Sequence, residues 1–161
     1  MTSNDNDRWD AVEEATELLL EGNHEGALAS LKRVLEGDAS NFYAYHYVGV
    51  TMQALGRTEA ARDAYFAAVK LSPNYLAARL GLSHILRGLG YIDGAIRQAR
   101  EALDRFPKDG DAHYALALGY VAAKQPQSAR VHLEKFLAPK PEFEAQVEAR
   151  GLLDAINKSQ S

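Results

Sequence analysis

Phe42-Tyr43-Ala44-Tyr45-His46-Tyr47-Val48-Gly49-Val50-Thr51-Met52 opens the stretch that decides the fold, and this stretch runs to Tyr75. Leu55-Gly56-Arg57 follows, and then come Ala61, Tyr65, Ala68 and Pro73. Apolar and small residues recur every three or four positions on both sides of Gly56, a spacing typical of amphipathic helices. We therefore predict two helices that meet at Gly56. Pro73 should end the second one, because the residue before a proline avoids the α region.

The same spacing returns along the chain with a period of 34 residues. Three interleaved sets of residues keep this step, and chance does not explain their common register: Gly22, Gly56 and Gly90; Ala27, Ala61, Ala95 and Ala129; Pro73, Pro107 and Pro141. Units of two helices with this period resemble the tetratricopeptide repeat (TPR) family. The resemblance covers about residues 8–143, and these residues match the family pattern: Tyr45, Val48, Gly49, Met52, Ala61, Tyr65, Ala68 and Pro73.

The resemblance implies an all-α fold, a right-handed α-solenoid of four TPR helix pairs plus a C-terminal capping helix. We expect a single TPR domain over 1–161, with repeats at about 8–41, 42–75, 76–109 and 110–143 and a cap helix at 142–157. The N-terminal residues 1–7 should be mobile or serve as a helix cap. The other expected helices span about 8–21, 24–36, 41–55, 58–71, 74–89, 92–106, 109–123 and 126–137.

Each repeated position has a mechanical reason. Small side chains let two helices approach closely, and we assign this role to Ala15, Gly49, Ser83 and Ala117 on the first helices and to the repeated alanines on the second. Gly22, Gly56 and Gly90 follow the first helices, where a left-handed residue ends a helix at little cost. The fourth repeat departs from this pattern, because Lys124 replaces the glycine. The first repeat also departs, with Ala39 in place of the proline.

Composition excludes several classes of function. The chain has 161 residues, 47% of them apolar and 25% charged, which is ordinary for one globular domain. The net charge is −4 and no basic run is present, so we expect no nucleic-acid binding. No window is apolar enough to span a membrane, and residues 1–7 do not look like a secretory signal. We predict a cytoplasmic protein. Cysteine is absent, which removes disulfides and thiol chemistry.

The first helix of each TPR pair lines the inner, concave wall, and the repeat register shows which residues face inward. The inward positions are mostly aromatic or aliphatic, whereas exposed helix faces are usually polar. We therefore predict an apolar groove that binds a helix or an extended peptide of a partner protein. The predicted contact residues are Trp9, Val12, Tyr43, His46, Tyr47, Val50, Leu80, His84, Arg87, Tyr114, Leu118 and Val121. The alternative is that several of them, notably Tyr47, Leu80 and Leu118, are core between repeats.

Other kinds of site find little support in the sequence. One TPR subfamily grips a terminal carboxylate with Lys, Asn and Arg, but the matching positions here are Val12, Thr16, Tyr47, Ala77 and Gly81. His46, His84 and His113 lie on successive first helices, and contact with a peptide is a better interpretation of them than metal binding. The acidic residues near the repeat junctions fit helix capping better than calcium. We expect no cofactor, no metal and no enzymatic activity.

Two further functions stay open beside the adaptor. Stacked repeats have similar ends, so the chain could assemble with itself, a mode that resembles the magnetosome-coat TPR proteins. The tail at 141–143 and 152–158 also resembles the C-terminal helix of type III secretion translocator chaperones. Those proteins mostly have three repeats, whereas this chain has four.

Overall fold

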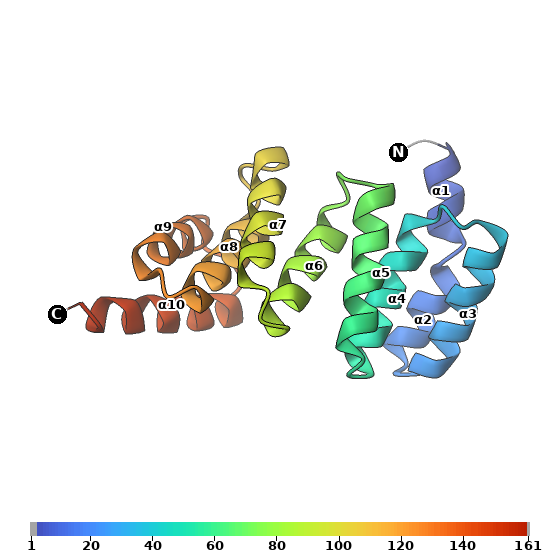
Figure 1. Cartoon of the computed structure of the whole chain (residues 1–161), viewed down its shortest axis with the longest axis horizontal. Coiled ribbons are helices and arrows are strands. Elements are labelled where there is room, and N and C mark those ends of the chain that lie inside the picture. The colour runs from blue at the N-terminus through green and yellow to red at the C-terminus, as the bar shows by residue number, and fades with distance from the viewer. Residues whose placement is uncertain (1–2, 161) are drawn as a thin grey trace. The chain divides into compact units, whose positions relative to one another are not determined.

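The computed structural model describes residues 3–160, which hold ten α-helices and no strand (Figure 1). They divide into two compact units, one up to Ile85 and the other from Leu86 onward. The boundary lies within the third repeat expected from the sequence. The helices are α1 Ser3–Asp10, α2 Glu13–Leu20, α3 His24–Gly37, α4 Phe42–Ala54, α5 Thr58–Leu71, α6 Leu76–Gly88, α7 Ile92–Arg105, α8 Gly110–Ala122, α9 Pro126–Leu137 and α10 Phe143–Lys158. From α3 onward, the predicted helices agree with these bounds within two residues.

The N-terminal helix differs from the prediction, because it is broken between Asp10 and Glu13. The carbonyl of Arg8 accepts a hydrogen bond from the Asn41 side chain at 2.9 Å. The Val12 amide, which would donate to this carbonyl in a continuous helix, donates to the Trp9 carbonyl instead. The Arg8 guanidinium also pairs with Asp38 at 2.9 Å. These contacts tie α1 to the loop before α4. The expectation that residues 1–7 lie outside a helix is wrong for Ser3 to Asp7, which belong to α1, and residues 1 and 2 lie outside the described residues.

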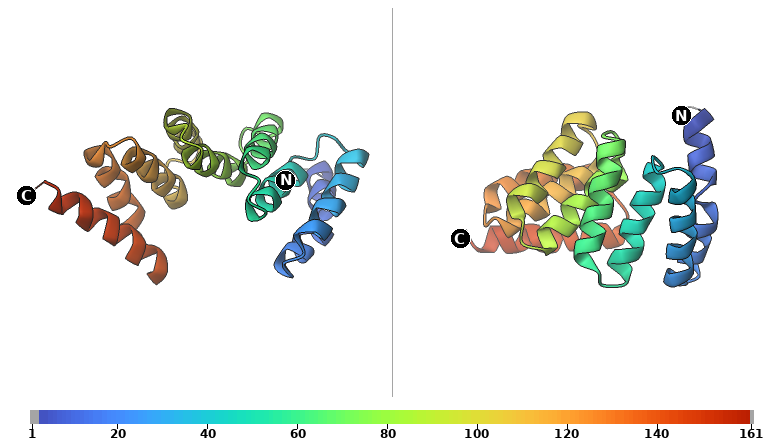
Figure 2. Two further views of the ribbon diagram at one scale, coloured as in Figure 1. Left: turned by 60° about the horizontal axis from the view of Figure 1, so that its bottom comes forward. Right: turned by 45° about the vertical axis from the view of Figure 1, so that its right-hand side comes forward.

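The small residues at the helix crossings are all buried, as predicted. Gly49 of α4 shows why, because a Cβ atom there would lie 2.8 Å from the ring of Tyr65 on α5. In the first unit, α4 and α5 lie side by side in all views (Figures 1 and 2). A separate core forms where α2, α3 and α4 pack together, and it includes Val12, Ala15, Leu31, Tyr43 and Ala44.

In the second unit, α8 packs against both α7 and α9, and α10 packs against α9. The core includes Leu116, Leu133 and Phe136, and α10 adds Ala149 and Ile156 to it. The predicted capping role of the last helix is therefore confirmed for Ile156.

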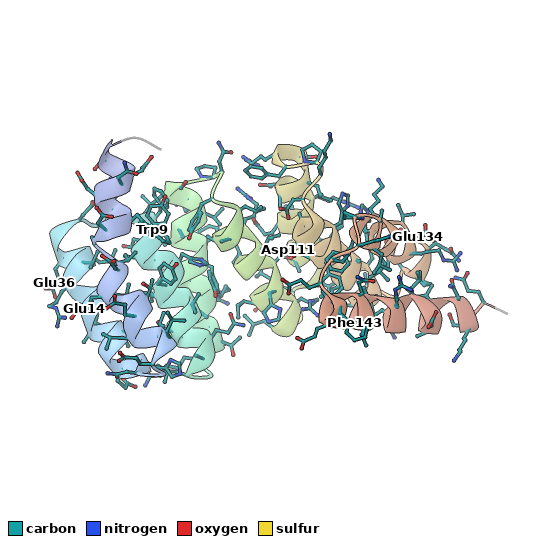
Figure 3. The ribbon with its side chains drawn as sticks, turned by 180° about the vertical axis from the view of Figure 1, so that it is seen from behind. Trp9, Glu14, Glu36, Asp111, Glu134 and Phe143 are labelled. Atoms are coloured by element: carbon teal, nitrogen blue, oxygen red, sulfur yellow. The ribbon has the colours of Figure 1, made fainter. Side chains whose placement is uncertain are left out.

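Only some of the large apolar side chains of α10 pack against the core. Leu152 and Leu153 pack against the core. Phe143 and Val147 do not, because they are 79% and 54% exposed, and Figure 3 shows Phe143 at the start of the helix. The side of α10 that carries these two residues faces away from the core.

The turns between paired helices follow the glycine prediction. Gly22, Gly56 and Gly90 have φ angles of +78°, +74° and +87°. Lys124 occupies the same place in the fourth repeat and also lies in the left-handed region, with φ +58°. A side chain with a Cβ atom is strained there, whereas glycine is not.

We expect Lys124→Gly to stabilise the second unit by about 1 kcal/mol, because glycine adopts the left-handed conformation without strain. Part of this gain is offset, because glycine also gives the unfolded chain more conformational freedom. Chemical denaturation of the full chain measures the effect. Lys124→Ala is the matched control, since it removes the same charge and keeps the Cβ atom. If the alanine variant gains as much as the glycine variant, charge rather than backbone strain is responsible.

Candidate protein-binding surface

Seven rings gather in the first unit, and we call them the aromatic cluster: Trp9, Phe42, Tyr43, His46, Tyr47, Tyr65 and Tyr75. They come from α1, from α4, from α5 and from the turn before α6. Trp9 lies edge-on to Tyr43 at 5.2 Å and tilted to Tyr47 at 6.3 Å, on the side of α1 that faces α4 (Figure 3). Such edge and tilted contacts are the preferred geometry of aromatic pairs.

Local capping fixes the helix that carries most of these rings. The Asn41 side chain accepts a hydrogen bond from the Ala44 amide at 3.1 Å and so caps α4. The same side chain donates to the Arg8 carbonyl. One asparagine therefore sets the start of α4 and holds α1 beside it, which brings Trp9 onto the tyrosines.

His46 lies among three tyrosine rings of the cluster. Its ring centre is 5.0 Å from Tyr47, 5.1 Å from Tyr75 and 5.6 Å from Tyr65. Burial lowers the pKa of His46 to about 4. Its Nδ1 atom is buried without a hydrogen-bond partner among the described residues. The imidazole is thus neutral at physiological pH and acts as an aromatic ring rather than as a cation.

The tyrosines of the cluster stay protonated in the same way. Burial raises the pKa of Tyr65 to about 12, and it raises the pKa values of Tyr43, Tyr47 and Tyr75 as well. The Tyr65 hydroxyl donates to the Gln53 side chain at 3.0 Å. The cluster therefore offers rings and neutral hydroxyl groups to a ligand, with no ionised phenolate.

The structure sorts the predicted contact residues of the first unit into three groups. Trp9 is 44% exposed, and His84 is also exposed. Four residues are half-buried: His46, Tyr47, Val50 and Leu80. The expectation is wrong for Val12, which is fully buried, and for Tyr43, which is 8% exposed and lies in the core. Val12 lies in the turn between α1 and α2 and Tyr43 lies on α4, and both pack into the same core, so a partner does not reach them directly.

In the second unit, three of the predicted residues are half-buried, namely Arg87, Tyr114 and Leu118, and Val121 is exposed, at 37%. Tyr114 packs on Phe136 with ring centres 4.8 Å apart. Burial raises the pKa of Tyr114, and the Glu148 carboxylate raises it further, whereas Arg87 opposes the shift. The Tyr114 hydroxyl is buried and has no hydrogen-bond partner of ordinary geometry within the described residues.

His113 is paired, but with a residue outside the predicted set. Its Nε2 atom donates to the Pro107 carbonyl at 3.1 Å, which leaves Nδ1 as an acceptor for the His132 Nδ1–H at 3.0 Å. Burial lowers the pKa of His132, and His113, Lys135 and Arg100 lower it further. Within residues 3–160, no three metal-ligating side chains gather at one place. The two imidazoles form a hydrogen-bonded pair.

Sequence reasoning missed several parts of these surfaces. Phe42 and Tyr75 belong to the aromatic cluster, but neither occupies one of the inward positions from which the contact residues were predicted. Tyr75 precedes α6, and the density of aromatic residues between Phe42 and Tyr75 was the available signal. No signal of spacing points to the contact of Arg100 with Tyr120, because these residues lie on different helices.

The comparisons with known proteins agree on the fold. No known family model matches the chain. A thermophilic TPR protein of Thermus thermophilus, TTC0263, is 21% identical with a TM-score of 0.74, over 96% of this chain and 83% of that one. This chain has the tetratricopeptide-repeat fold. Two other TPR neighbours are 20% identical: Pseudomonas aeruginosa PilF (TM-score 0.85, 99% of this chain and 71% of that one) and MamA 41-end from Desulfovibrio magneticus RS-1 (TM-score 0.81, 99% and 87%).

Curated relatives match a smaller part of this chain. DnaJ homolog subfamily C member 3 of Homo sapiens is 27% identical over 100 residues, which is 62% of this chain and 20% of the relative. The Bos taurus protein matches to the same extent. The chain thus spans about one fifth of the length of these relatives. None of the described helices is long and apolar enough to cross a membrane.

Proposed function

We propose that this TPR protein is an adaptor that binds a helix or an extended segment of another protein on its first helices. The observation that carries the proposal is Trp9, which exposes 44% of its surface although it packs on the buried Tyr43 and the half-buried Tyr47. Aromatic anchors on a rigid base are the typical hot spots of protein interfaces. His46 and Tyr47 extend the same surface, and both are half-buried and uncharged at neutral pH.

Two further observations support a binding role. In the second unit, Val121 is exposed and Tyr114 and Leu118 are half-buried at the equivalent positions of α8. The likeness to solved structures includes Cut9 in a complex titled the APC/C hetero-tetramer Cut9-Hcn1, at 22% identity and a TM-score of 0.80, over 92% of this chain and 29% of that one. That structure contains a protein of this fold in a complex with a different protein. By analogy, we infer a protein partner for this chain.

The test uses the full chain as bait in its native host. We expect the double variant Trp9→Ala/Tyr47→Ala to recover at least about tenfold less partner than the wild type, because two aromatic anchors are lost. Phe66→Ala is the matched control, since Phe66 is 51% exposed on α5, outside the aromatic cluster. Far-ultraviolet circular dichroism checks that all baits are folded. Equal recovery by the double variant and the wild type would refute this surface as the binding site.

Self-association is the second candidate, and the exposed pair Phe143 and Val147 on α10 favours it. The same experiment separates the two functions when the host carries a second copy of the chain with a different tag. Recovery of that copy alone, unaffected by the Trp9→Ala/Tyr47→Ala change, supports assembly through another face. The resemblance of the tail to secretion chaperones stays a prediction.

A further inference from the structure

The second unit contains a polar pocket that the adaptor surface does not include. It has a volume of about 390 Å³ and lies where α7 meets the end of α8 and the start of α9. Its lining residues are Asp93, Ile96, Arg97, Arg100, Tyr120 and Gln125. Two of the six are arginines, and they lie about one helical turn apart on the same face of α7.

Arg100 is held in a fixed orientation. Its Nε and one terminal nitrogen donate to the Tyr120 hydroxyl at 3.2 and 2.6 Å, and the guanidinium lies 5.6 Å from the centre of that ring. Tyr120 is itself only 7% exposed and stacks on His132 at 5.8 Å. A guanidinium has five N–H donors, and the phenol takes up two. The remaining donors are available to a ligand without a further loss of side-chain freedom.

Arg97 and Asp93 complete the charge of the pocket. Within the described part of the chain, Arg97 forms no ion pair, and the Asp93 carboxylate pairs with neither arginine. Two cations and one carboxylate leave a net positive charge. The N-terminus of α9 adds to it, because Gln125 provides no side-chain cap and the partial positive charge of the helix end remains.

We propose that this pocket binds an oxyanion, a phosphate or carboxylate group carried by a small molecule or by a partner. Arg100 supplies an oriented donor fork, Arg97 supplies a second cation, and both match the geometry of these anions. Asp93 weakens the attraction and so limits the site to ligands that use both guanidinium groups. The proposal is independent of the adaptor function, because no residue of the pocket belongs to the aromatic cluster.

An internal reporter allows the site to be tested without knowing the natural ligand. His132 stacks on Tyr120, which bonds to Arg100. Its pKa is lowered by burial first, and the positive charge of Arg100 is one of the smaller causes. An anion that neutralises Arg100 should therefore raise the pKa of His132.

The experiment titrates the full chain separately with inorganic phosphate and with succinate, and it follows the imidazole signals of His132 by nuclear magnetic resonance. We expect saturable binding of at least one anion and a higher His132 pKa in the bound state. Arg97→Gln and Arg100→Gln should each raise Kd about tenfold or more, because a hydrogen bond to a charged group is lost. Asp93→Asn should lower Kd. Arg150→Gln, at an exposed arginine of α10, is the control and should not change it.

The outcomes separate the possible ligands. Binding of phosphate alone assigns the pocket to phosphate groups, and binding of both anions extends it to carboxylates. Absence of saturable binding by either anion overturns the proposal, as does an unchanged Kd in Arg97→Gln. Arg97 forms no ion pair within the described residues, so the Arg97→Gln variant should fold even if Arg100→Gln does not.

Discussion

Replacing Tyr65 by alanine should lower the free energy of unfolding of the first unit by about 3–5 kcal/mol, as expected for an aromatic side chain removed from a core. Tyr65 is 3% exposed and packs against the backbone of two helices, at Gly49 of α4 and Gly81 of α6. Neither glycine has a side chain that could fill the cavity. Trp9 is the only tryptophan in the sequence and lies in the first unit, so its fluorescence reports this transition.

Tyr65→Phe separates the ring from the hydroxyl. It keeps the packing and removes only the hydrogen bond to Gln53, so we expect a loss of about 1 kcal/mol or less. If phenylalanine costs as much as alanine, the hydroxyl rather than the ring stabilises this part of the fold.

A double-mutant cycle tests the contact itself. A Cβ atom at Gly81 would lie 2.7 Å from the Tyr65 ring, so Gly81→Ala should destabilise the wild type by overpacking. In the Tyr65→Ala background the same change should be neutral or stabilising, because the clash is gone and alanine favours a helix over glycine by about 1 kcal/mol. Additive effects of the two changes would contradict this packing.

The residues that the sequence analysis placed best are those whose role repeats every 34 positions. Gly56 must turn the chain and Ala61 must fit a helix crossing in each unit, so these constraints recur and are visible as a pattern. The break after Asp10 is different, because it depends on a hydrogen bond between Arg8 and Asn41, far apart in the sequence. A helical period contains no information about such a contact.

The candidate site was predicted less well than the fold, for a geometric reason. A first helix in this fold has apolar residues both toward the next repeat and toward the open wall. Val12 and Tyr43 pack toward the next repeat, whereas Trp9 lies largely on the open wall. All three nevertheless occupy positions that the repeat register assigns to the inner wall. Only the neighbouring helices decide between core and surface, and they are set by tertiary packing.

Acidification should destabilise the first unit through His46. Its pKa of about 4 in the folded protein lies below the ordinary value of 6.5, so the unfolded chain binds more protons as the pH falls. Stability is complete above about pH 6.5 and decreases toward the folded pKa. Between about pH 8 and about pH 5, this one group should cost about 2 kcal/mol. Denaturation followed by Trp9 fluorescence at a series of pH values measures the loss.

His46→Phe should remove this pH dependence, because a phenyl ring occupies the same place among the tyrosines and does not titrate. The difference between the wild type and the variant cancels the contribution of the other histidines. Equal slopes for the wild type and His46→Phe would mean that His46 is solvated when folded. The aromatic cluster would then be open at its centre, and a partner would meet a cationic imidazole in acid instead of a buried neutral ring.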